Sequence, residues 1–379
     1  MECQQENMIY VDYKNGLFND VVPFIERTNN FLKAKAYLTW NCVVEPQKRN
    51  IQLAKEYCIK SFVYNHGLYG HEDHCSFMSD IHTPIHKMPM TADVYLCWGK
   101  RDYNDLKNEG IPEEKLKIVG YTGLWESVYD YKLDSGKIFR TSFNSGNTIE
   151  DPKTKEKGVL VGRDHRIRKQ HEKPKWILYM PSHDVIDRHL CHTLKNYKIL
   201  KDVKDLIIKS SSAYVGLDDK NPFKDIKDYN YCGKCDILIE TKYGKFCKCE
   251  QCGGEMPLMP KVTYTATSSP DNLAKLRILI SESKCVITDY VGTPNLLCYA
   301  MGVPVITIKN DYGLRLNGEI THHACSADIL CEPKDLLKTI EDVISGKIDK
   351  KKEMAEAAEQ YGGVSYDWPT QNILKEIET

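Results

Sequence analysis

The sequence SKCVITDYVGTPNLLCYAMGVPVITIK, residues 283–309, decides the fold. Its apolar start, Cys285–Ile287, predicts a buried strand. The turn Gly292–Pro294 then opens a segment whose apolar residues recur at helical spacing, and Gly302 ends that helix. Val303–Ile308 resumes as an almost wholly apolar strand, as parallel sheets buried on both faces require. The stretch therefore predicts strand, turn, short helix and strand of an α/β protein with a parallel sheet.

The turn before this helix is a candidate anion site. Gly292, Thr293 and Pro294 lie where backbone N–H groups and the positive end of a helix dipole point at whatever sits above the strand end. A phosphate is the usual occupant of such a site. Asp289 directly follows the strand and is interpreted either as a partner for a ligand hydroxyl or as a cap of the turn.

Length and charge set the broad class. The chain has 379 residues, which favours two domains, each with its own core. A formal net charge of −1 argues against a general surface for binding polyanions. A basic run over residues 163–175 is interpreted either as a local patch or, preferably, as a solvated loop between domains.

Strand and helix signals alternate along most of the chain, which predicts two Rossmann-like, doubly wound parallel-sheet domains. We expect an N-terminal acceptor domain over residues 1–130 and a polar linker over 131–173. A nucleotide-donor domain is expected over 174–360, and a final helix over 361–379 should pack back toward the first domain.

The cysteines give the most specific chemical signal. Of 15 cysteines, two pairs have the C-x-x-C spacing of a zinc ribbon: Cys232 with Cys235, and Cys249 with Cys252. Cys247 is a surplus thiol that could replace Cys249, although the two glycines after Cys252 favour the 249/252 pair. We expect one structural Zn²⁺ in an insertion over residues 228–258, because four protein ligands leave no open position for catalysis.

Polar residues follow other predicted strands and are candidates for the ligand crevice, since open α/β sheets bind ligands at the carboxyl ends of their strands. His66 and Gly67 follow one strand, and His66 is interpreted as a general base or phosphate partner. Ser182 and His183 follow another. Lys209 ends a third and is a weaker candidate for a phosphate contact.

No signal peptide of the usual type and no apolar run long enough to span a membrane is visible in the sequence. The many scattered cysteines fit a reducing compartment. We therefore expect a soluble, cytoplasmic protein.

In order and spacing, these motifs resemble the two-domain GT-B glycosyltransferases, particularly the CDP-glycerol glycerophosphotransferases and capsular polysaccharide transferases. The resemblance rests on these segments: His66-Gly67 with Gly70, Ala92–Gly99, Gly110–Gly120, Ile177–His183, Val286–Tyr290 and Ala300–Val305. It covers roughly residues 35–125, 175–210 and 261–377, without the predicted ribbon.

Two departures from that family pattern bear on the donor. Val291-Gly292 stands where the family has paired serines, and Lys209-Ser210 lacks the family's histidine. Both leave the fold prediction intact and leave the donor's identity open.

The resemblance implies transfer of a sugar or polyol phosphate from a nucleotide-activated donor to an acceptor hydroxyl, in a cleft between the domains. His66 would deprotonate the acceptor, and the turn at Gly292-Thr293 would stabilise the leaving diphosphate. The acceptor is expected to be a glycan or, as a minority hypothesis, a nucleic acid contacted by the lysine-rich ribbon. Two alternatives stay open: a nucleotide-sugar 2-epimerase, which needs no acceptor, and a zinc-ribbon protein that binds nucleic acid.

Overall fold

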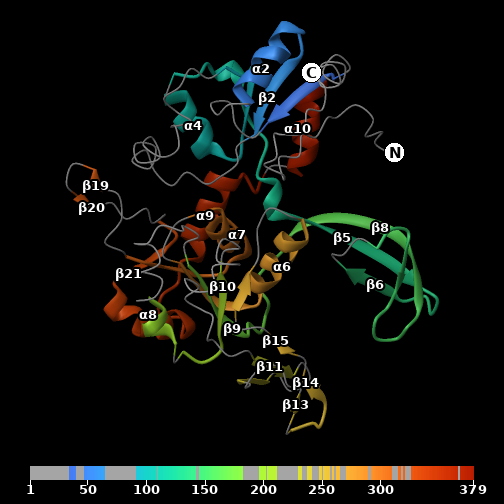
Figure 1. Cartoon of the computed structure of the whole chain (residues 1–379), viewed down its shortest axis with the longest axis vertical. Coiled ribbons are helices and arrows are strands. Elements are labelled where there is room, and N and C mark those ends of the chain that lie inside the picture. The colour runs from blue at the N-terminus through green and yellow to red at the C-terminus, as the bar shows by residue number, and fades with distance from the viewer. Residues whose placement is uncertain are drawn as a thin grey trace, which may run out of the picture. The chain divides into compact units, whose positions relative to one another are not determined.

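A computed structural model of the chain forms two compact units (Figure 1). The N-terminal unit comprises Met1–Thr122 and Glu359–Thr379, and the C-terminal unit comprises Gly123–Ala358. The structure describes residues 34–39, 47–64, 91–108, 110–141, 145–181, 196–201, 203–210, 229–232, 237–240, 247–249, 251–256, 258–259, 262–264, 270–288, 292–309, 315–316, 319–320, 326–365 and 368–379. Among these residues, no helix combines the length and the apolar character that crossing a membrane requires.

Four parallel strands form the sheet of the N-terminal unit, in the order β1-β2-β3-β4. They are β1 (Ala36–Thr39), β2 (Lys60–Tyr64), β3 (Val94–Cys97) and β4 (Leu116–Ile118). The order follows the chain without reversal. The alternation of strands and helices that the sequence predicts for this region is confirmed.

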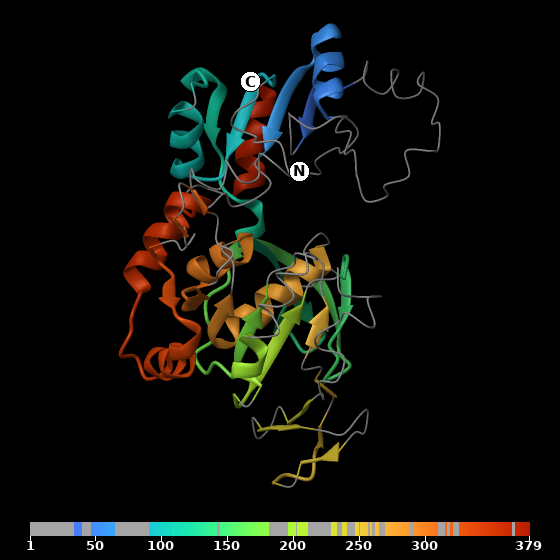
Figure 2. The same cartoon turned by 60° about the vertical axis from the view of Figure 1, so that its left-hand side comes forward.

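Helices cover both faces of this sheet. The helices α2 (Gln47–Glu56) and α4 (Lys100–Asn108) bury apolar side chains such as Ile51 and Leu106 against the face that carries Val63. The helix α10 (Pro369–Glu378) packs Ile373 against the opposite face. Figure 2 shows this helix, in red, beside the sheet.

Six parallel strands form the main sheet of the C-terminal unit, in the order β16-β10-β9-β17-β18-β21. They are β9 (Trp176–Met180), β10 (Leu206–Ser210), β16 (Val262–Tyr264), β17 (Ser283–Thr288), β18 (Val305–Ile308) and β21 (Ile329–Cys331). If these strands are numbered one to six along the chain, the order is 3-2-1-4-5-6, that of a Rossmann sheet.

The quoted stretch 283–309 forms β17, the helix α7 (Thr293–Met301) and β18, as predicted. Gly302 ends α7 in the left-handed region, with φ of 77°. The helix α8 (Leu336–Ile344) packs on one face of the sheet against residues such as Ile287. The helix α6 (Pro270–Ser281) lies by the start of β9, where Trp176 Nε1 donates a hydrogen bond of 3.0 Å to Leu279 O.

Residues 131–173, which we expected to be a linker, instead form most of a folded antiparallel sheet within the C-terminal unit. Its order is β6-β5-β8-β7, with β5 (Trp125–Leu133), β6 (Ile138–Thr141), β7 (Thr148–Glu150) and β8 (Lys157–Ile167). One face buries side chains such as Tyr131, which is 0 % exposed. The other face carries charged side chains such as Lys132 and Arg140 together with the exposed apolar residues Ile138, Val159 and Val161.

Short antiparallel strands occupy the chain between β10 and β16. They are β11 (Tyr229–Cys232), β12 (Ile237–Glu240), β13 (Cys247–Lys248), β14 (Glu255–Met256) and β15 (Leu258–Met259). A further small hairpin joins β19 (Arg315–Leu316) to β20 (Glu319–Ile320). The remaining elements are the helix α9 (Lys351–Gly362) and the 3-10 turns η2 (Glu113–Lys115), η3 (Thr122–Leu124) and η5 (Pro333–Asp335).

Candidate functional site

The order of the C-terminal sheet places a crevice at one point of its edge. The chain fills one half of the sheet from β9 outward to β16, and then the other half from β17 outward to β21. Connections on the two sides of the β9/β17 pair therefore lead away from each other. Thr288 at the end of β17 pairs with Met180 at the end of β9, so both strands end at the same level. Open α/β sheets bind ligands in this position.

The helix α7 begins beside this crevice. Gly292 is its N-cap and has extended backbone, with φ of −152°. The Asn295 amide donates to Gly292 O at 2.9 Å, and the Gly292 amide donates to Asn295 Oδ1 at 3.3 Å. Pro294 has no N–H group. The first turn can therefore offer an anion mainly the helix dipole and the partly buried Thr293, with the Gly292 amide available if it leaves Asn295.

A chain of buried hydrogen bonds ties the last turn of α7 to the sheet. Tyr299 of α7 donates its hydroxyl proton to Asp328 Oδ1 at 2.5 Å, and Thr307 Oγ1 of β18 donates to Asp328 Oδ2 at 3.0 Å. Thr307 Oγ1 also lies 3.3 Å from Thr288 Oγ1, at the end of β17. All four side chains are buried. Because these bonds join Tyr299 to β17, β18 and the residue before β21, they hold the C-terminal part of α7 against the sheet.

Lys209 lies level with Thr288 across the sheet. The parallel register pairs Ile208 with Tyr179 of β9, so the next pair places Lys209 beside Met180, which itself pairs with Thr288. Burial lowers the pKa of Lys209 below its usual value. No acidic side chain among the described residues forms an ion pair with it. A desolvated cation without a counterion at a ligand edge is a candidate phosphate partner.

Five predicted site residues lie outside the described residues: His66, Gly67, Ser182, His183 and Asp289. Each follows a described strand within three residues: β2 ends at Tyr64, β9 at Met180 and β17 at Thr288. Their roles therefore stay predictions.

Aromatic side chains occupy the corresponding edge of the N-terminal sheet. Trp98, directly after β3, stacks on Tyr121 with ring centroids 4.0 Å apart. The Tyr64 hydroxyl accepts a hydrogen bond of 2.8 Å from the Thr122 amide and donates one of 3.1 Å to Gly120 O. Burial strongly raises the pKa of Tyr64, so its hydroxyl stays protonated. Sequence reasoning did not select these residues, because an aromatic residue at a strand end is ordinary core.

The backbone of α9 closes over this edge at Gly99. A Cβ atom on Gly99 would overlap Gln360 O and would lie 2.8 Å from Gln360 C and 2.9 Å from Tyr361 C. Only glycine allows this approach. Gly99 is therefore required for the close packing of α9 against this edge.

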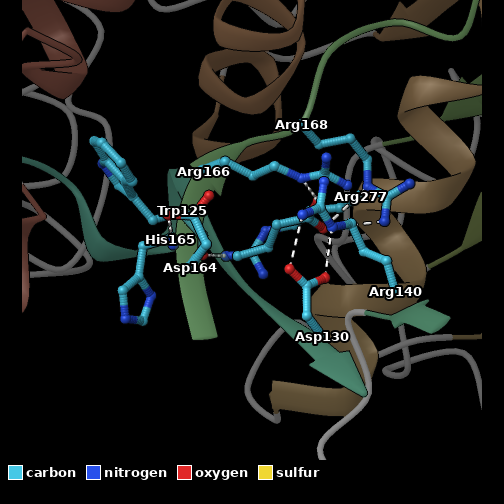
Figure 3. A network of polar contacts seen from close by, with 9 residues as sticks. Trp125, Asp130, Arg140, Asp164, His165, Arg166, Arg168 and Arg277 are labelled. Carbon is cyan, nitrogen blue, oxygen red and sulfur yellow. Dashed lines mark hydrogen bonds and ion pairs between the residues drawn. The ribbon is translucent and has the colours of Figure 1, made fainter. Parts of the chain in front are cut away.

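The basic run 163–175 begins in the antiparallel sheet, because residues 163–167 are the end of β8, and it continues as irregular chain to β9 (Figure 3). Arg166 and Arg168 both bind Glu126, whose side chain is 4 % exposed, at 3.3 and 3.0 Å. In the same view, Arg277 of α6 donates to Gly123 O and to Trp125 O, both at 2.6 Å. Arg166 and Arg168 thus neutralise a buried carboxylate, and Arg277 ties α6 to the start of β5.

Comparison with known proteins bears on the fold. No family model and no curated protein matches this chain. Among solved structures, UDP-GlcNAc 2-epimerase from Neisseria meningitidis bound to UDP-GlcNAc is similar with a TM-score of 0.50 and 12% identity, over 98% of this chain and 86% of that one. The chain has a two-domain fold of the GT-B type.

Two further structures are similar at lower scores. S. aureus MnaA in its UDP co-structure has a TM-score of 0.49 and 11% identity, over 93% of this chain and 78% of that one. The glycotransferase of kitacinnamycin has a TM-score of 0.41 and 8% identity, over 95% of this chain and 84% of that one.

Proposed function

We propose that the protein is a glycosyltransferase of the GT-B type that moves a sugar, or a polyol phosphate, from a nucleotide-activated donor to an acceptor hydroxyl. The observation that carries the proposal is the 3-2-1-4-5-6 strand order with α7 beginning beside the β9/β17 pair. The positive end of the α7 dipole and the positive charge of Lys209 can balance the negative charge of a diphosphate. The sequence resemblance to the CDP-glycerol branch supports the same assignment.

The donor's diphosphate binds at the start of α7 in this proposal. The helix dipole, Thr293 and the Gly292 amide stabilise its negative charge, while Pro294 fixes the first turn. Lys209 lies in the row of Met180 and Thr288 and supplies a full positive charge. A phosphate beside Lys209 favours its protonated form and so offsets the effect of burial on its pKa. Ser182 and His183, after β9, and Gly67, after β2, complete the donor contacts.

Transfer of a sugar makes one bond and breaks one. The acceptor oxygen attacks the anomeric carbon, the bond from that carbon to the diphosphate oxygen breaks, and its electron pair leaves with the diphosphate. His66 takes the proton from the acceptor hydroxyl as general base. Asp289 holds a hydroxyl of the bound donor. The α7 dipole lowers the barrier most where charge develops on the leaving group.

A nucleotide-sugar 2-epimerase is the second candidate. It is favoured by the fold, because the Neisseria meningitidis structure with this fold is a UDP-GlcNAc 2-epimerase bound to UDP-GlcNAc. Both candidates bind a nucleotide sugar at the same edge, and they differ in whether an acceptor is required.

Binding is tested first, with a thermal-shift panel of UDP-, CDP-, GDP-, ADP- and TDP-linked sugars and CDP-polyols. A ligand that binds only the folded state raises the unfolding temperature by mass action. We expect one nucleotide class to raise it. No response across the panel by folded protein would contradict both candidates.

The reaction is then tested by NMR of the responding donor in deuterated water. A transferase releases the nucleotide only when an acceptor is added, and the donor sugar keeps its configuration without one. Inversion at C2 with solvent deuterium incorporated, in the absence of acceptor, would instead establish the epimerase. Glycans and single-stranded nucleic acid serve as the first acceptor classes, and a mobility-shift assay with Cys249→Ser as control tests the latter.

A further inference from the structure

Two antiparallel hairpins between β10 and β16 each carry a Cys-x-x-Cys sequence. In the first, β11 pairs with β12, and the last pair joins Cys232 to Ile237, so Cys235 belongs to the connecting residues. In the second, β13 pairs with β14 through Lys248 and Glu255, so Cys249 and Cys252 fall in the connection. Each pair of thiols thus follows the end of a strand at a hairpin turn.

The backbone of the second turn folds around its cysteines. The Cys249 amide donates to Gly254 O, and the Gly253 amide donates to Cys249 O, both at 2.8 Å. Gly253 has a φ of 65°, a conformation that favours glycine. A Cβ atom on Gly254 would lie 3.3 Å from Cys252 Sγ, so glycine leaves that sulfur room. Cys249 is 2 % exposed. The two glycines are thus explained by a turn built around the sulfur atoms.

The two hairpins belong to one small module. Besides β12, β11 also pairs with β15, through Tyr229 with Met259 and Asn230 with Leu258. Continuing this antiparallel register by two residues places Cys232 opposite Met256 of β14. The end of β11 therefore lies beside the strand that leaves the second turn. The strand that contains Cys232 and the strand that follows Cys252 are thus in contact.

We propose that this module holds one Zn²⁺ through the thiolates of Cys232, Cys235, Cys249 and Cys252. A tetrahedral site of four sulfurs is the arrangement that two such turns build, and it leaves no open coordination position. The side chains of Cys232 and Cys235 lie outside the described residues, and among those described no group of three metal-binding side chains is found.

The module needs a cross-link such as a bound metal because its strands are only two to four residues long. Strands of this length bury too little apolar surface to hold a fold without a metal or disulfide. The metal is therefore structural, and the inference is independent of the proposed reaction.

The backbone also separates Cys249 from Cys247. Cys247 lies within β13 and pairs with Met256, whereas both backbone polar groups of Cys249 bond within the turn. The C-x-x-C spacing of Cys249 from Cys252, with both in one hydrogen-bonded turn, selects Cys249 as the proposed ligand, and Cys247 is the control for that assignment.

The experiment measures metal in the purified full-length protein by mass spectrometry, and then replaces the metal with Co²⁺. We expect about one zinc per chain and, with cobalt, the visible bands and the sulfur-to-cobalt charge transfer of a tetrahedral thiolate site. Cys249→Ser and Cys232→Ser should lose the stoichiometric metal and the spectrum. Cys247→Ser and Cys58→Ser, the latter at an exposed cysteine, should keep both.

Wild-type protein that binds neither metal stoichiometrically would overturn the proposal, and so would a cobalt spectrum without thiolate character. Loss of metal in Cys247→Ser with retention in Cys249→Ser would overturn the ligand assignment. If a ligand variant fails to fold, the cobalt spectrum of the wild-type chain still decides the proposal. Nucleotide binding is measured separately, so a failure of the proposed function would not be confused with absence of the metal site.

Discussion

The two parallel sheets of this protein end differently at their carboxyl edges. In the N-terminal sheet the described strands follow chain order, and the edge is occupied by the stacked rings of Trp98 and Tyr121. In the C-terminal sheet the order reverses between β9 and β17, and the edge carries Lys209 and the start of α7. The difference teaches that a Rossmann-like sheet alone does not make an anion site. In the proposed function, the reversal between β9 and β17 and the positive charge of Lys209 beside it supply such a site.

The largest effect is expected from Asp328→Ala, which breaks the support of α7. The Tyr299 and Thr307 hydroxyls would lose a buried charged acceptor, at about 2 kcal/mol each. We expect a loss of about 4 kcal/mol in the free energy of unfolding, measured by chemical denaturation. Thr288→Val, at the far end of the chain of hydrogen bonds, should cost about 1 kcal/mol. Equal losses in both variants would contradict a support centred on the carboxylate.

Gly99→Ala tests whether the N-terminal edge is built for packing. Its Cβ would meet backbone atoms of Gln360 and Tyr361, which cannot move as a flexible side chain would. We expect a destabilisation of about 3 kcal/mol. The matched control is Gly162→Ala, whose Cβ would lie an ordinary 3.7 Å from Asp130 Cβ. A neutral Gly99→Ala would show that α9 does not close this edge.

Tyr64→Phe removes one hydroxyl from the same edge. It leaves the Thr122 amide and Gly120 O without their partner, which we expect to cost about 2 kcal/mol. Tyr103→Phe is the control, because the Tyr103 hydroxyl bonds to Glu113 in an exposed position. Thermal unfolding of both variants measures the difference. A larger loss in the control would contradict a structural role for the Tyr64 hydroxyl.

Lys209→Met should have opposite effects on stability and on binding. Burial lowers the pKa of Lys209 in the folded state, so its charge costs stability at neutral pH, and the cost fades as the pH rises through the lowered value toward 10.5. The variant should therefore be slightly more stable than wild type at pH 7, with an advantage that shrinks toward pH 10.5. Nucleoside diphosphate binding should weaken about tenfold, as loss of one charged hydrogen bond predicts.

Titration calorimetry and denaturation at several pH values measure the two effects. Lys201→Met, at an exposed position, should change neither. A variant that is destabilised at neutral pH and still binds nucleotide normally would remove Lys209 from the site.

The sequence was sufficient to predict the two parallel sheets and the β17–α7–β18 unit. In the central strands β3, β9, β17 and β18 nearly every residue is buried, so apolar runs and a Gly-Thr-Pro turn mark them directly. It was insufficient for the β5–β8 sheet, where one face is exposed and mixes charged with apolar residues, and where Tyr131 and Leu133 alternate with Lys132. Alternation of that kind is easily taken for a polar linker.

The buried residues that hold α7 against the sheet could not be predicted from the sequence either. Thr288, Tyr299, Thr307 and Asp328 are up to 40 positions apart and meet only because the sheet order places β18 between β17 and β21. No local pattern identifies such a set. The strand-end residues were visible from sequence because the position after an apolar strand is itself a local pattern.

The most direct test of the central claim is amide hydrogen exchange of the full-length protein with and without the nucleoside diphosphate of the responding donor. The account predicts slower exchange at the first turn of α7, from Thr293 to Leu296, and at the end of β10 around Lys209. Amides around Trp98 and Gly99 should be unchanged. Slower exchange confined to the N-terminal edge, with α7 and β10 unaffected, would contradict the account.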